Sequence, residues 1–535
     1  MNGAPGRAAT GRDSLYGEVL RLVQARDFRE ADTRCRDLNA AHDSFAPGFL
    51  LGSVVAQHLN EHGRALQLAE RAVAIAPGDS STLLRLAQCL DGLRRRPEAL
   101  RAAAAAERAC GGNPRALAAL GLFYSAADEH FLSLATYDRA CREAPDDAWL
   151  LFSRAVLRKN VGQLEEAEAD YDRVIDLDPK NYESYTNRAN LRTQTPERNH
   201  VAQLEALLGR GDADAEGQVQ LSYALAKEYA DLGRHAESWK QLGRGARLRR
   251  RRLTYDIAAD LATVDALIEA FPSAPSQPAA DAAGDAPIFV VGLPRAGSTL
   301  VERILSSHSG VRAAGELRHF MLAFAAAARA KSGRDDLPQL QAIALSPQLD
   351  FAALGRDYLA RCRPAAGEAL RFIDKMPVNY LYCGLIRRAL PNARIVHVAR
   401  TPQAACYAIY RMLFRDGYPF SYDLDELAQY YIAYRRLMDH WQRTMPGVIH
   451  ELSYERLVAD QEGETRRLLE FCGLGWEDAC LDFHRNPAAS TSASAHQVRR
   501  PIYRSAVDEW RNYATQLAGL RSRLEAAGIA VEAAA

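Results

Sequence analysis

Residues able to hold a phosphate group follow a short apolar run in the second half of the chain. The run is Ile288-Phe-Val-Val291, and the next segment reads Gly292-Leu-Pro-Arg-Ala-Gly-Ser-Thr299 before apolar residues return at helical spacing. A buried strand, a glycine-rich turn and a helix start form an anion site, because backbone N–H groups and the helix dipole face one point. Arg295 would add a forked cation, and Ser298 and Thr299 would add hydroxyl donors. An ordinary strand–turn–helix connection is the alternative.

Two common nucleotide-binding loops fit this segment poorly. Gly292 and Gly297 have the spacing of a Walker A loop, but Ser298 stands where that motif requires lysine. The turn also lacks the G-x-G-x-x-G pattern of dinucleotide-binding folds. A nucleoside triphosphatase is therefore disfavoured, and a nucleotide kinase remains a distant alternative.

Two motifs resemble those of sulfotransferases that use 3′-phosphoadenosine-5′-phosphosulfate (PAPS). Pro294-Arg-x-Gly-Ser-Thr-Leu300 resembles their 5′-phosphosulfate loop, and the strand-like segment 394–402 resembles their 3′-phosphate site. Ala408 stands where the family places a serine, so the 3′-phosphate would be bound either less strongly or by other donors. The resemblance implies that PAPS contacts Arg295, Ala296, Gly297, Ser298, Thr299, Leu300 and Arg400.

Further segments resemble the same family. Asp374-Lys-Met-Pro377 is similar to its D-K-x-P element, which implies that Lys375 contacts the sulfuryl group or the leaving phosphate. Residues 497–503, followed by Trp510-Arg511, resemble the nucleotide-closing segment of bacterial repeat-containing sulfotransferases. The nucleotide contacts and the serine near the transferring group that these resemblances imply are Arg499, Arg500, Tyr503 and Ser494.

The resemblance also implies a catalytic base. Glu316 follows Gly315 and matches the glutamate that acts as base in tyrosylprotein sulfotransferases, whereas small-molecule sulfotransferases use a histidine. His319 is therefore the alternative base, and His397 is expected in the core or on the nucleotide side. The expected reaction is in-line transfer, with Glu316 accepting the acceptor's proton while Arg295 and Lys375 stabilise negative charge. No cluster of metal ligands is found, and no metal is expected.

The first half must be read as a repeat. Turn residues recur every 34 positions, which is the tetratricopeptide period, and small residues recur twelve positions before each turn. The turn residues are Asp43, Pro77, Gly111, Pro145 and Pro179, and the small residues are Ala31, Ala65, Ala99, Ser133 and Ala167. Small residues let antiparallel helices approach closely. An alanine-rich bundle with accidental spacing is the alternative.

The expected fold class is α plus α/β. An N-terminal α-solenoid resembling tetratricopeptide repeats is predicted over 12–250, with its last helix pair as a cap. The segment 271–287 is rich in Pro, Ala and Ser and is predicted to be a linker. A P-loop-like α/β sulfotransferase domain with a central parallel sheet is predicted over 288–520. The solenoid would either bind a peptide or partner protein, or only stabilise the second half.

Composition limits the remaining possibilities. The 535 residues include 67 Lys plus Arg and 67 Asp plus Glu, so the formal net charge is zero, which argues against a nucleic-acid binder. The nine cysteines show no C-x-x-C spacing and are expected to be reduced. No apolar run approaches the roughly 20 residues that cross a bilayer. We therefore expect a cytoplasmic protein without membrane insertion.

These observations favour a PAPS-dependent sulfotransferase that acts on a hydroxyl acceptor. The resemblance to tyrosylprotein enzymes and the repeat array suggest a peptide or protein tyrosine, recruited with or without a partner by the repeats. The alternative is a non-catalytic scaffold with a vestigial domain, which Ala408 and Ala296 would fit. The sequence does not identify the acceptor molecule. It is compatible with a homodimer but does not determine the oligomeric state.

Overall fold

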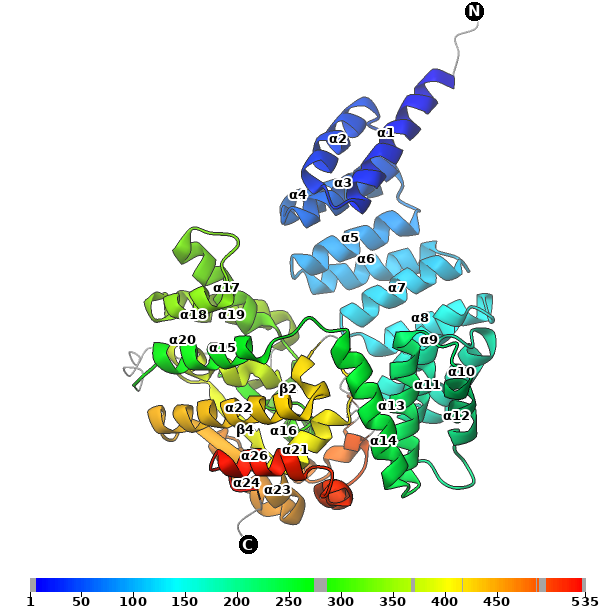
Figure 1. Cartoon of the computed structure of the whole chain (residues 1–535). Coiled ribbons are helices and arrows are strands. Elements are labelled where there is room, and N and C mark those ends of the chain that lie inside the picture. The colour runs from blue at the N-terminus through cyan, green and yellow to red at the C-terminus, as the bar shows by residue number, and fades with distance from the viewer. Residues whose placement is uncertain are drawn as a thin grey trace, which may run out of the picture. The chain divides into compact units, whose positions relative to one another are not determined.

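The computed structural model describes residues 6–273, 286–366, 371–415, 417–486, 488–489 and 497–531 (Figure 1). The chain divides into two compact units, Met1–Val161 and Gly162–Ala535. Helices alone make up the described part of the first unit, and helices with a parallel sheet make up the second, so the fold is α plus α/β as predicted. The unit boundary falls inside the predicted repeat region. Most of the predicted linker, and Ser494, lie outside the described residues.

Antiparallel helix pairs build the first unit, and the 34-residue period is confirmed there. Asp43, Pro77, Gly111 and Pro145 each lie in the turn between one pair and the next. The helices are α1 (Gly6–Gln24), α2 (Phe28–Ala41), α3 (Ala46–His58), α4 (His62–Ile75), α5 (Ser80–Gly92), α6 (Arg96–Ala109), α7 (Pro114–Ala126), α8 (His130–Glu143) and α9 (Ala148–Val161).

Close helix contacts explain the small residues of the repeat. Ala31, Ala99 and Ser133 are fully buried, and the Ser133 hydroxyl donates a 2.7 Å hydrogen bond to the Gly121 carbonyl across the α7–α8 pair. A Cβ at Gly121 would stand 2.5 Å from the Tyr137 ring. The two helices are therefore too close for larger side chains at these positions.

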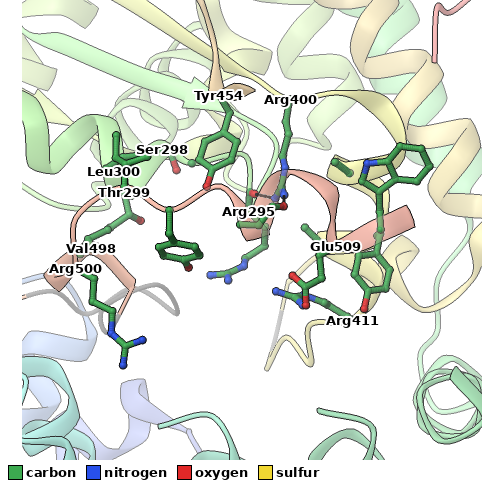
Figure 2. A pocket seen from close by; sticks show the side chains of 18 of the residues that line it. Arg295, Ser298, Thr299, Leu300, Arg400, Arg411, Tyr454, Val498, Arg500 and Glu509 are labelled. Atoms are coloured by element: carbon green, nitrogen blue, oxygen red, sulfur yellow. Dashed lines mark hydrogen bonds and ion pairs between the residues drawn. The ribbon is translucent and has the colours of Figure 1, made fainter. Parts of the chain in front are cut away.

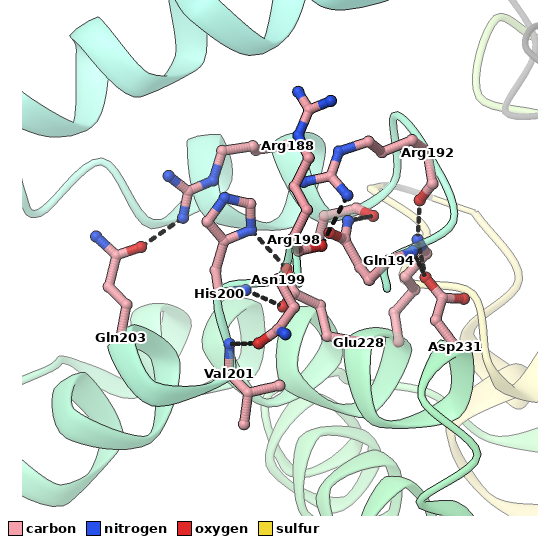
Figure 3. A network of polar contacts seen from close by, with 12 residues as sticks. Arg188, Arg192, Gln194, Arg198, Asn199, His200, Val201, Gln203, Glu228 and Asp231 are labelled. Carbon is pink, nitrogen blue, oxygen red and sulfur yellow. Dashed lines mark hydrogen bonds and ion pairs between the residues drawn. The ribbon is translucent and has the colours of Figure 1, made fainter. Parts of the chain in front are cut away.

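The second unit begins with further helices, α10 (Leu164–Leu177), α11 (Tyr182–Ala189), α12 (Val201–Arg210), α13 (Ala215–Asp231), α14 (His235–Arg251) and α15 (Ile257–Ala270). A polar network holds the connection between α11 and α12 (Figure 3). His200 donates its backbone N–H to the buried Glu228 carboxylate (2.6 Å), and Gln194 does the same to Asp231 (2.7 Å). Ion pairs between Arg192 and Glu168 add to it. This irregular segment is therefore fixed to α13 by buried charge-assisted hydrogen bonds.

Five parallel strands form the central sheet, in the order β2-β3-β1-β4-β5. The strands are β1 (Ile288–Gly292), β2 (Val311–Ala313), β3 (Arg371–Asp374), β4 (Arg394–Ala399) and β5 (Ile449–Ser453). Every residue of β1 is buried, as its unbroken apolar run predicts for a central parallel strand. The order reverses at β1, because the chain moves first to one side of β1 and then to the other.

Helices and short 3-10 turns complete the second unit (Figure 1). The helices are α16 (Ser298–Ser306), α17 (His319–Ser332), α18 (Gln339–Leu345), α19 (Phe351–Ala366), α20 (Cys383–Ala389), α21 (Pro402–Tyr410), α22 (Leu424–Thr444), α23 (Tyr454–Ala459), α24 (Gln461–Phe471), α25 (Ser505–Asp508) and α26 (Ala518–Ala526). The 3-10 turns are η1 (Ser346–Gln348), η2 (Pro377–Tyr382), η3 (Pro419–Tyr422), η4 (Asp478–Cys480), η5 (Phe483–Arg485), η6 (Gln497–Arg499) and η7 (Glu509–Tyr513). None of the described helices is long and apolar enough to span a bilayer.

Helices α13 and α14 share one apolar core with the sheet-containing part of the chain. Val219, Tyr223 and Leu242 belong to the same buried cluster as Phe289 of β1. Arg250, at the end of α14, forms a two-pronged ion pair with Glu426 of α22, with contacts of 2.7 Å. This helix pair is therefore part of the second unit's core.

Candidate functional site

The predicted site residues follow the carboxyl ends of neighbouring strands. The glycine-rich loop follows β1, Lys375 follows β3, Arg400 follows β4 by one residue, and Tyr454 follows β5. In open parallel sheets, ligands bind at this edge where the strand order reverses. The topology therefore brings motifs that are spread over residues 292–454 to one edge of the sheet.

Backbone conformation explains the two glycines of the loop. Gly292 has φ of 146°, and a Cβ there would stand 2.6 Å from the carbonyl oxygen of Val398 on β4. Gly297 has φ of 105°, and a Cβ there would stand 2.5 Å from the Tyr454 ring. Arg295 also has a positive φ, 65°, which is unusual for a residue with a side chain. Helix α16 then begins at Ser298, so its first N–H groups face the loop.

An open pocket of about 850 Å³ lies against this loop (Figure 2). Of the residues predicted to contact PAPS, the pocket lining includes Arg295, Gly297, Ser298, Thr299, Leu300, Arg400, Arg500 and Tyr503. Ala296 instead points into the core and is 2% exposed. Further lining residues come from α21, η7 and the start of α23, among them Tyr407, Ala408, Arg411, Tyr454, Glu509 and Trp510. The lining therefore joins the phosphate loop to residues of α21, η7 and α23.

Three arginines and one carboxylate gather in this pocket, while Arg500 stands apart from them (Figure 2). Burial, together with the charges of Arg411 and Arg400, lowers the pKa of Arg295 to about 10. Arg411 is ion-paired with Glu509, and its guanidinium lies 5.4 Å from the Tyr407 ring centre. The cluster therefore carries excess positive charge that an anionic ligand would neutralise.

Arg400 is held by backbone and ring contacts. Its guanidinium donates hydrogen bonds to the carbonyl of Arg295 (3.2 Å) and to that of Ala506, and it lies 5.0 Å from the Tyr454 ring centre. Its Nε is buried and has no hydrogen-bond partner among the described residues. Burial also lowers the pKa of Arg400. A buried donor of this kind fits a ligand with phosphate oxygens.

Lys375 and Glu316 meet at a second point, beside α16. The buried Lys375 ammonium, 4% exposed, is ion-paired with Glu316, whose side chain is 48% exposed. It also lies 3.8 Å from the carboxylate of Glu302, one helical turn beyond Ser298. Burial raises the pKa of Glu302, and Lys375 opposes that rise. A cation and two carboxylates of different exposure therefore lie next to the phosphate loop.

Other predicted residues stand outside these two clusters. Arg499 does not line the pocket: it packs against Gly162 and donates a 3.4 Å hydrogen bond to the Ala488 carbonyl. His397 is buried on β4 between Glu451 (3.1 Å) and the Tyr434 hydroxyl, in the core as predicted. Ser494 lies outside the described residues.

Sequence reasoning did not identify several residues of the site. Arg411, Tyr407 and Glu509 belong to no motif, although Arg411 directly follows the helix that begins after Arg400. Tyr454 directly follows β5 and was not among the residues predicted to contact PAPS. Glu302 follows Ser298 by four residues, the spacing that puts two side chains on one helix face.

Family models match two parts of this chain. Residues 287–478 match the model described as the sulfotransferase family, and residues 150–181 match that of the tetratricopeptide repeat. The chain carries a sulfotransferase-family domain together with tetratricopeptide repeats. The five strands and the phosphate loop fall within the matched sulfotransferase range, whereas the pocket residues Arg500, Tyr503 and Glu509 lie beyond it.

Curated relatives match parts of this chain. An uncharacterized protein of Aquifex aeolicus is 29% identical over 361 residues, which cover 66% of this chain and 47% of that protein. The protein-tyrosine sulfotransferase of Drosophila melanogaster is 24% identical over 243 residues, covering 42% of this chain and 46% of that one. The chain thus spans about half the length of these relatives. The solved sulfotransferase domain of the Synechococcus PCC 7002 olefin synthase is 20% identical, with a TM-score of 0.33, covering 48% of this chain and 99% of that one.

The sulfotransferase domain shows no metal centre in its described part. No group of three or more His, Cys, Asp or Glu side chains comes together there as a possible metal site. The nine cysteines are buried thiols, and burial raises the pKa of those at positions 383, 406 and 472. These thiols therefore have the character of core residues.

Proposed function

We propose that this sulfotransferase domain moves the sulfuryl group of PAPS to the hydroxyl group of a tyrosine in a peptide or protein. The observation that carries the proposal is the pairing of an arginine-lined pocket at the phosphate loop with the Lys375–Glu316 ion pair beside the same helix. One site would hold the nucleotide phosphates, and the other would act where the sulfuryl group is transferred.

The pocket residues fit a ligand with phosphates at two ends. The loop N–H groups, Ser298 and Thr299 would hold the 5′-phosphosulfate at the start of α16. Arg400 and Arg411 would hold the 3′-phosphate, and Arg411 would supply the donor that Ala408 lacks. Bidentate arginine contacts are strong and geometrically specific for phosphate.

Sulfuryl transfer would require two contributions from the protein, namely stabilisation of negative charge and acceptance of a proton. PAPS supplies an activated sulfuryl group whose transfer leaves an anionic phosphate. Lys375 would stabilise the negative charge of that phosphate, while Glu316 would accept the proton of the tyrosine hydroxyl. Glu302 would remain as the carboxylate facing Lys375 once Glu316 contacts the acceptor.

Aromatic side chains beside Glu316 support an aromatic acceptor. Burial raises the pKa of Tyr418 to about 12, and the nearby charge of Glu316 adds to that rise. The Tyr418 ring packs edge-on against Phe414, at 4.8 Å between ring centres, and Tyr418 has a positive φ of 56°. Strained residues are typical of binding sites, and aromatic rings favour a phenol as neighbour. The protein-tyrosine sulfotransferase relative agrees with this acceptor class.

We further propose that the repeats recruit the acceptor protein or a partner. Large apolar side chains are more than 40% exposed on helices α7, α8 and α9, namely Leu122, Phe131, Leu132 and Trp149. Solenoids of this type commonly bind proteins through such surfaces. Replacing Trp149 by alanine should then reduce sulfation of a protein acceptor without changing nucleotide affinity.

Nucleotide titration and labelled transfer test the activity. Calorimetric titration should show tight binding of the product nucleotide, 3′-phosphoadenosine-5′-phosphate (PAP), with adenosine 5′-phosphate (AMP) and ATP at least about tenfold weaker, since hydrogen bonds to charged groups contribute about 1.5–3 kcal/mol each. Labelled PAPS added to a cell lysate should label proteins on tyrosine, identified by mass spectrometry. Absence of both PAP binding and transfer would refute the proposal.

A matched pair of variants sharpens this test. Arg400→Gln should weaken PAP binding more than AMP binding, because AMP has no 3′-phosphate. Arg443→Gln, on the exposed end of α22, removes an equal charge far from the pocket residues and should leave both affinities unchanged. Equal behaviour of the two variants would argue against a 3′-phosphate site at Arg400.

A further inference from the structure

A buried tyrosine joins helix α14 to the wall of the nucleotide pocket. Tyr513, 1% exposed at the end of η7, stacks on Tyr407 with ring centres 4.7 Å apart. On its other side it contacts α14: its hydroxyl donates to Ser238 Oγ (3.1 Å), and its ring centre is 5.6 Å from that of Trp239. Tyr513 is therefore packed between the helix and a pocket-lining residue.

Tyr407, which stacks on Tyr513, also contacts Arg411. The Arg411 guanidinium lies over the Tyr407 ring, 5.4 Å from its centre. Trp239 also packs against Tyr410, the residue before Arg411, at 5.4 Å between ring centres. The position of Arg411 is thus set from two sides by rings that touch α14.

Turn η7, which ends at Tyr513, also contains residues that line the pocket. Glu509 and Trp510 line the pocket at the start of η7, and Glu509 is the ion-pair partner of Arg411. A 3-10 turn of five residues has no core of its own, so its position depends on what it packs against. Tyr513 fixes its last residue to α14 through buried contacts.

Helix α13 adds a second connection. Asp231, at the end of α13, accepts hydrogen bonds from Lys227 (2.6 Å) and from the backbone N–H of Gln194 (2.7 Å), in the network of Figure 3. Burial raises the pKa of Asp231, and the charges of Lys227 and, more weakly, Arg411 oppose that rise. The carboxylate therefore lies within electrostatic reach of the pocket arginine.

We infer that helices α13 and α14 support the lining of the donor site without contributing to it, with Tyr513 and Trp239 as positioning residues that hold Arg411 at the 3′-phosphate. The inference rests on the proposed function, because it concerns the same nucleotide pocket. It means that this helix pair contributes to donor recognition, and that its displacement would weaken donor binding.

The 3′-phosphate supplies a selective test in the full chain. Trp239→Leu removes the ring that packs on Tyr410 and Tyr513, and we expect affinity for PAP to fall about tenfold. Affinity for AMP should change by less than about twofold, since AMP does not need Arg411. Tyr513→Phe keeps the stacked ring and removes the hydroxyl that contacts Ser238 (3.1 Å) and His235 (3.4 Å) of α14, so it should lower PAP affinity about threefold.

Two controls separate positioning from a general loss of stability. Tyr229→Leu removes a ring of α13 that packs in the cluster between α10 and α13, away from η7, and should leave both affinities unchanged. In the Arg411→Gln background, Trp239→Leu should cause no further loss of PAP affinity, because both changes act through one group.

The possible outcomes are distinct. If the wild-type chain does not bind PAP, the proposed function fails. If the wild type binds PAP but folded Trp239→Leu and Tyr513→Phe keep wild-type affinity, the inference fails. The inference also fails if these variants lose PAP and AMP affinity by the same factor. An equal loss would indicate a general loss of protein stability and not a change at the 3′-phosphate. Selective loss of PAP affinity, suppressed by Arg411→Gln, supports the inference.

Discussion

Lys375 and Glu316 form an ion pair that joins the end of β3 to the segment before α17. The lysine is buried, whereas about half of the glutamate side chain is exposed, and the Glu302 carboxylate lies 3.8 Å from the same ammonium group. Without ligands, the candidate base and the candidate cation therefore neutralise each other. Glu316 is the partner that can leave, because water can hydrate it and Glu302 still faces Lys375.

The first prediction concerns the base. Glu316→Gln should lower the turnover number about 10²- to 10⁴-fold, the usual contribution of a general base. PAP affinity should stay near that of the wild type, because Glu316 does not line the nucleotide pocket. Single-turnover transfer to a tyrosine peptide, measured beside PAP titration, separates the two effects.

His319 serves as the control for this assignment. It begins α17, three residues after Glu316, and His319→Ala should retain most of the turnover. If His319→Ala were inactive and Glu316→Gln active, the histidine would be the base and the proposed role of Glu316 would be wrong.

The second prediction concerns the cation. Lys375→Met should reduce turnover about 10²- to 10³-fold, as for loss of one group that stabilises charge in a transition state. It should also leave Glu302 buried without its counter-charge, which raises the pKa of that carboxyl further. The exposed Lys331, on α17, offers Lys331→Met as a matched variant that should keep full activity. Equal turnover of the two variants would remove Lys375 from the mechanism.

The sequence predicts those parts of the site that are continuous along the chain. The loop from Gly292 to Thr299 and the strand before Arg400 can each be read locally, because a buried strand and a helix start have short-range patterns. The 34-residue repeat period can also be predicted from the sequence, because each turn lies between two helices of nearly constant length.

The remaining parts depend on contacts between distant segments. Arg411 and Glu509 are 98 residues apart, and neither carries a local pattern that predicts their ion pair. Arg250 of α14 likewise binds Glu426 of α22, far along the chain, and no local pattern predicts that pair. The unit boundary at Val161 is likewise invisible, because the helix period continues across it.

The third prediction concerns the loop backbone. Gly297→Ala combines a strained φ of 105° with a Cβ that would stand 2.5 Å from the Tyr454 ring. We expect PAP affinity to fall at least about tenfold, because strain of about 1–3 kcal/mol would be relieved by moving the loop N–H groups. Gly333→Ala, at the end of α17, has a similar positive φ of 68° but nothing within 4 Å of its Cβ. It should reduce stability without changing PAP affinity, and weakened PAP binding there would contradict a local role for Gly297.

The fourth prediction concerns the pH dependence of stability. Burial raises the pKa of Asp374 to about 8, from 3.8 in an exposed chain, although the Tyr358 hydroxyl donates it a 2.9 Å hydrogen bond. The folded state therefore holds this proton more tightly than the unfolded state. The resulting stabilisation is complete below about pH 4 and is lost as the pH rises through about 8, by at most about 1.4 kcal/mol per pH unit.

Urea unfolding of the full chain, followed by tryptophan fluorescence between pH 5 and pH 9, measures this effect. Asp374→Asn should remove its share of the decline, because the amide does not titrate. Asp357→Asn changes an exposed carboxylate of α19 and should decline with pH as the wild type does. An Asp374→Asn chain that lost stability just as steeply between pH 5 and pH 9 would show that Asp374 titrates below this range. The buried carboxyl beside Lys375 would then be charged in the working enzyme, and the electrostatics around that lysine would need a different account.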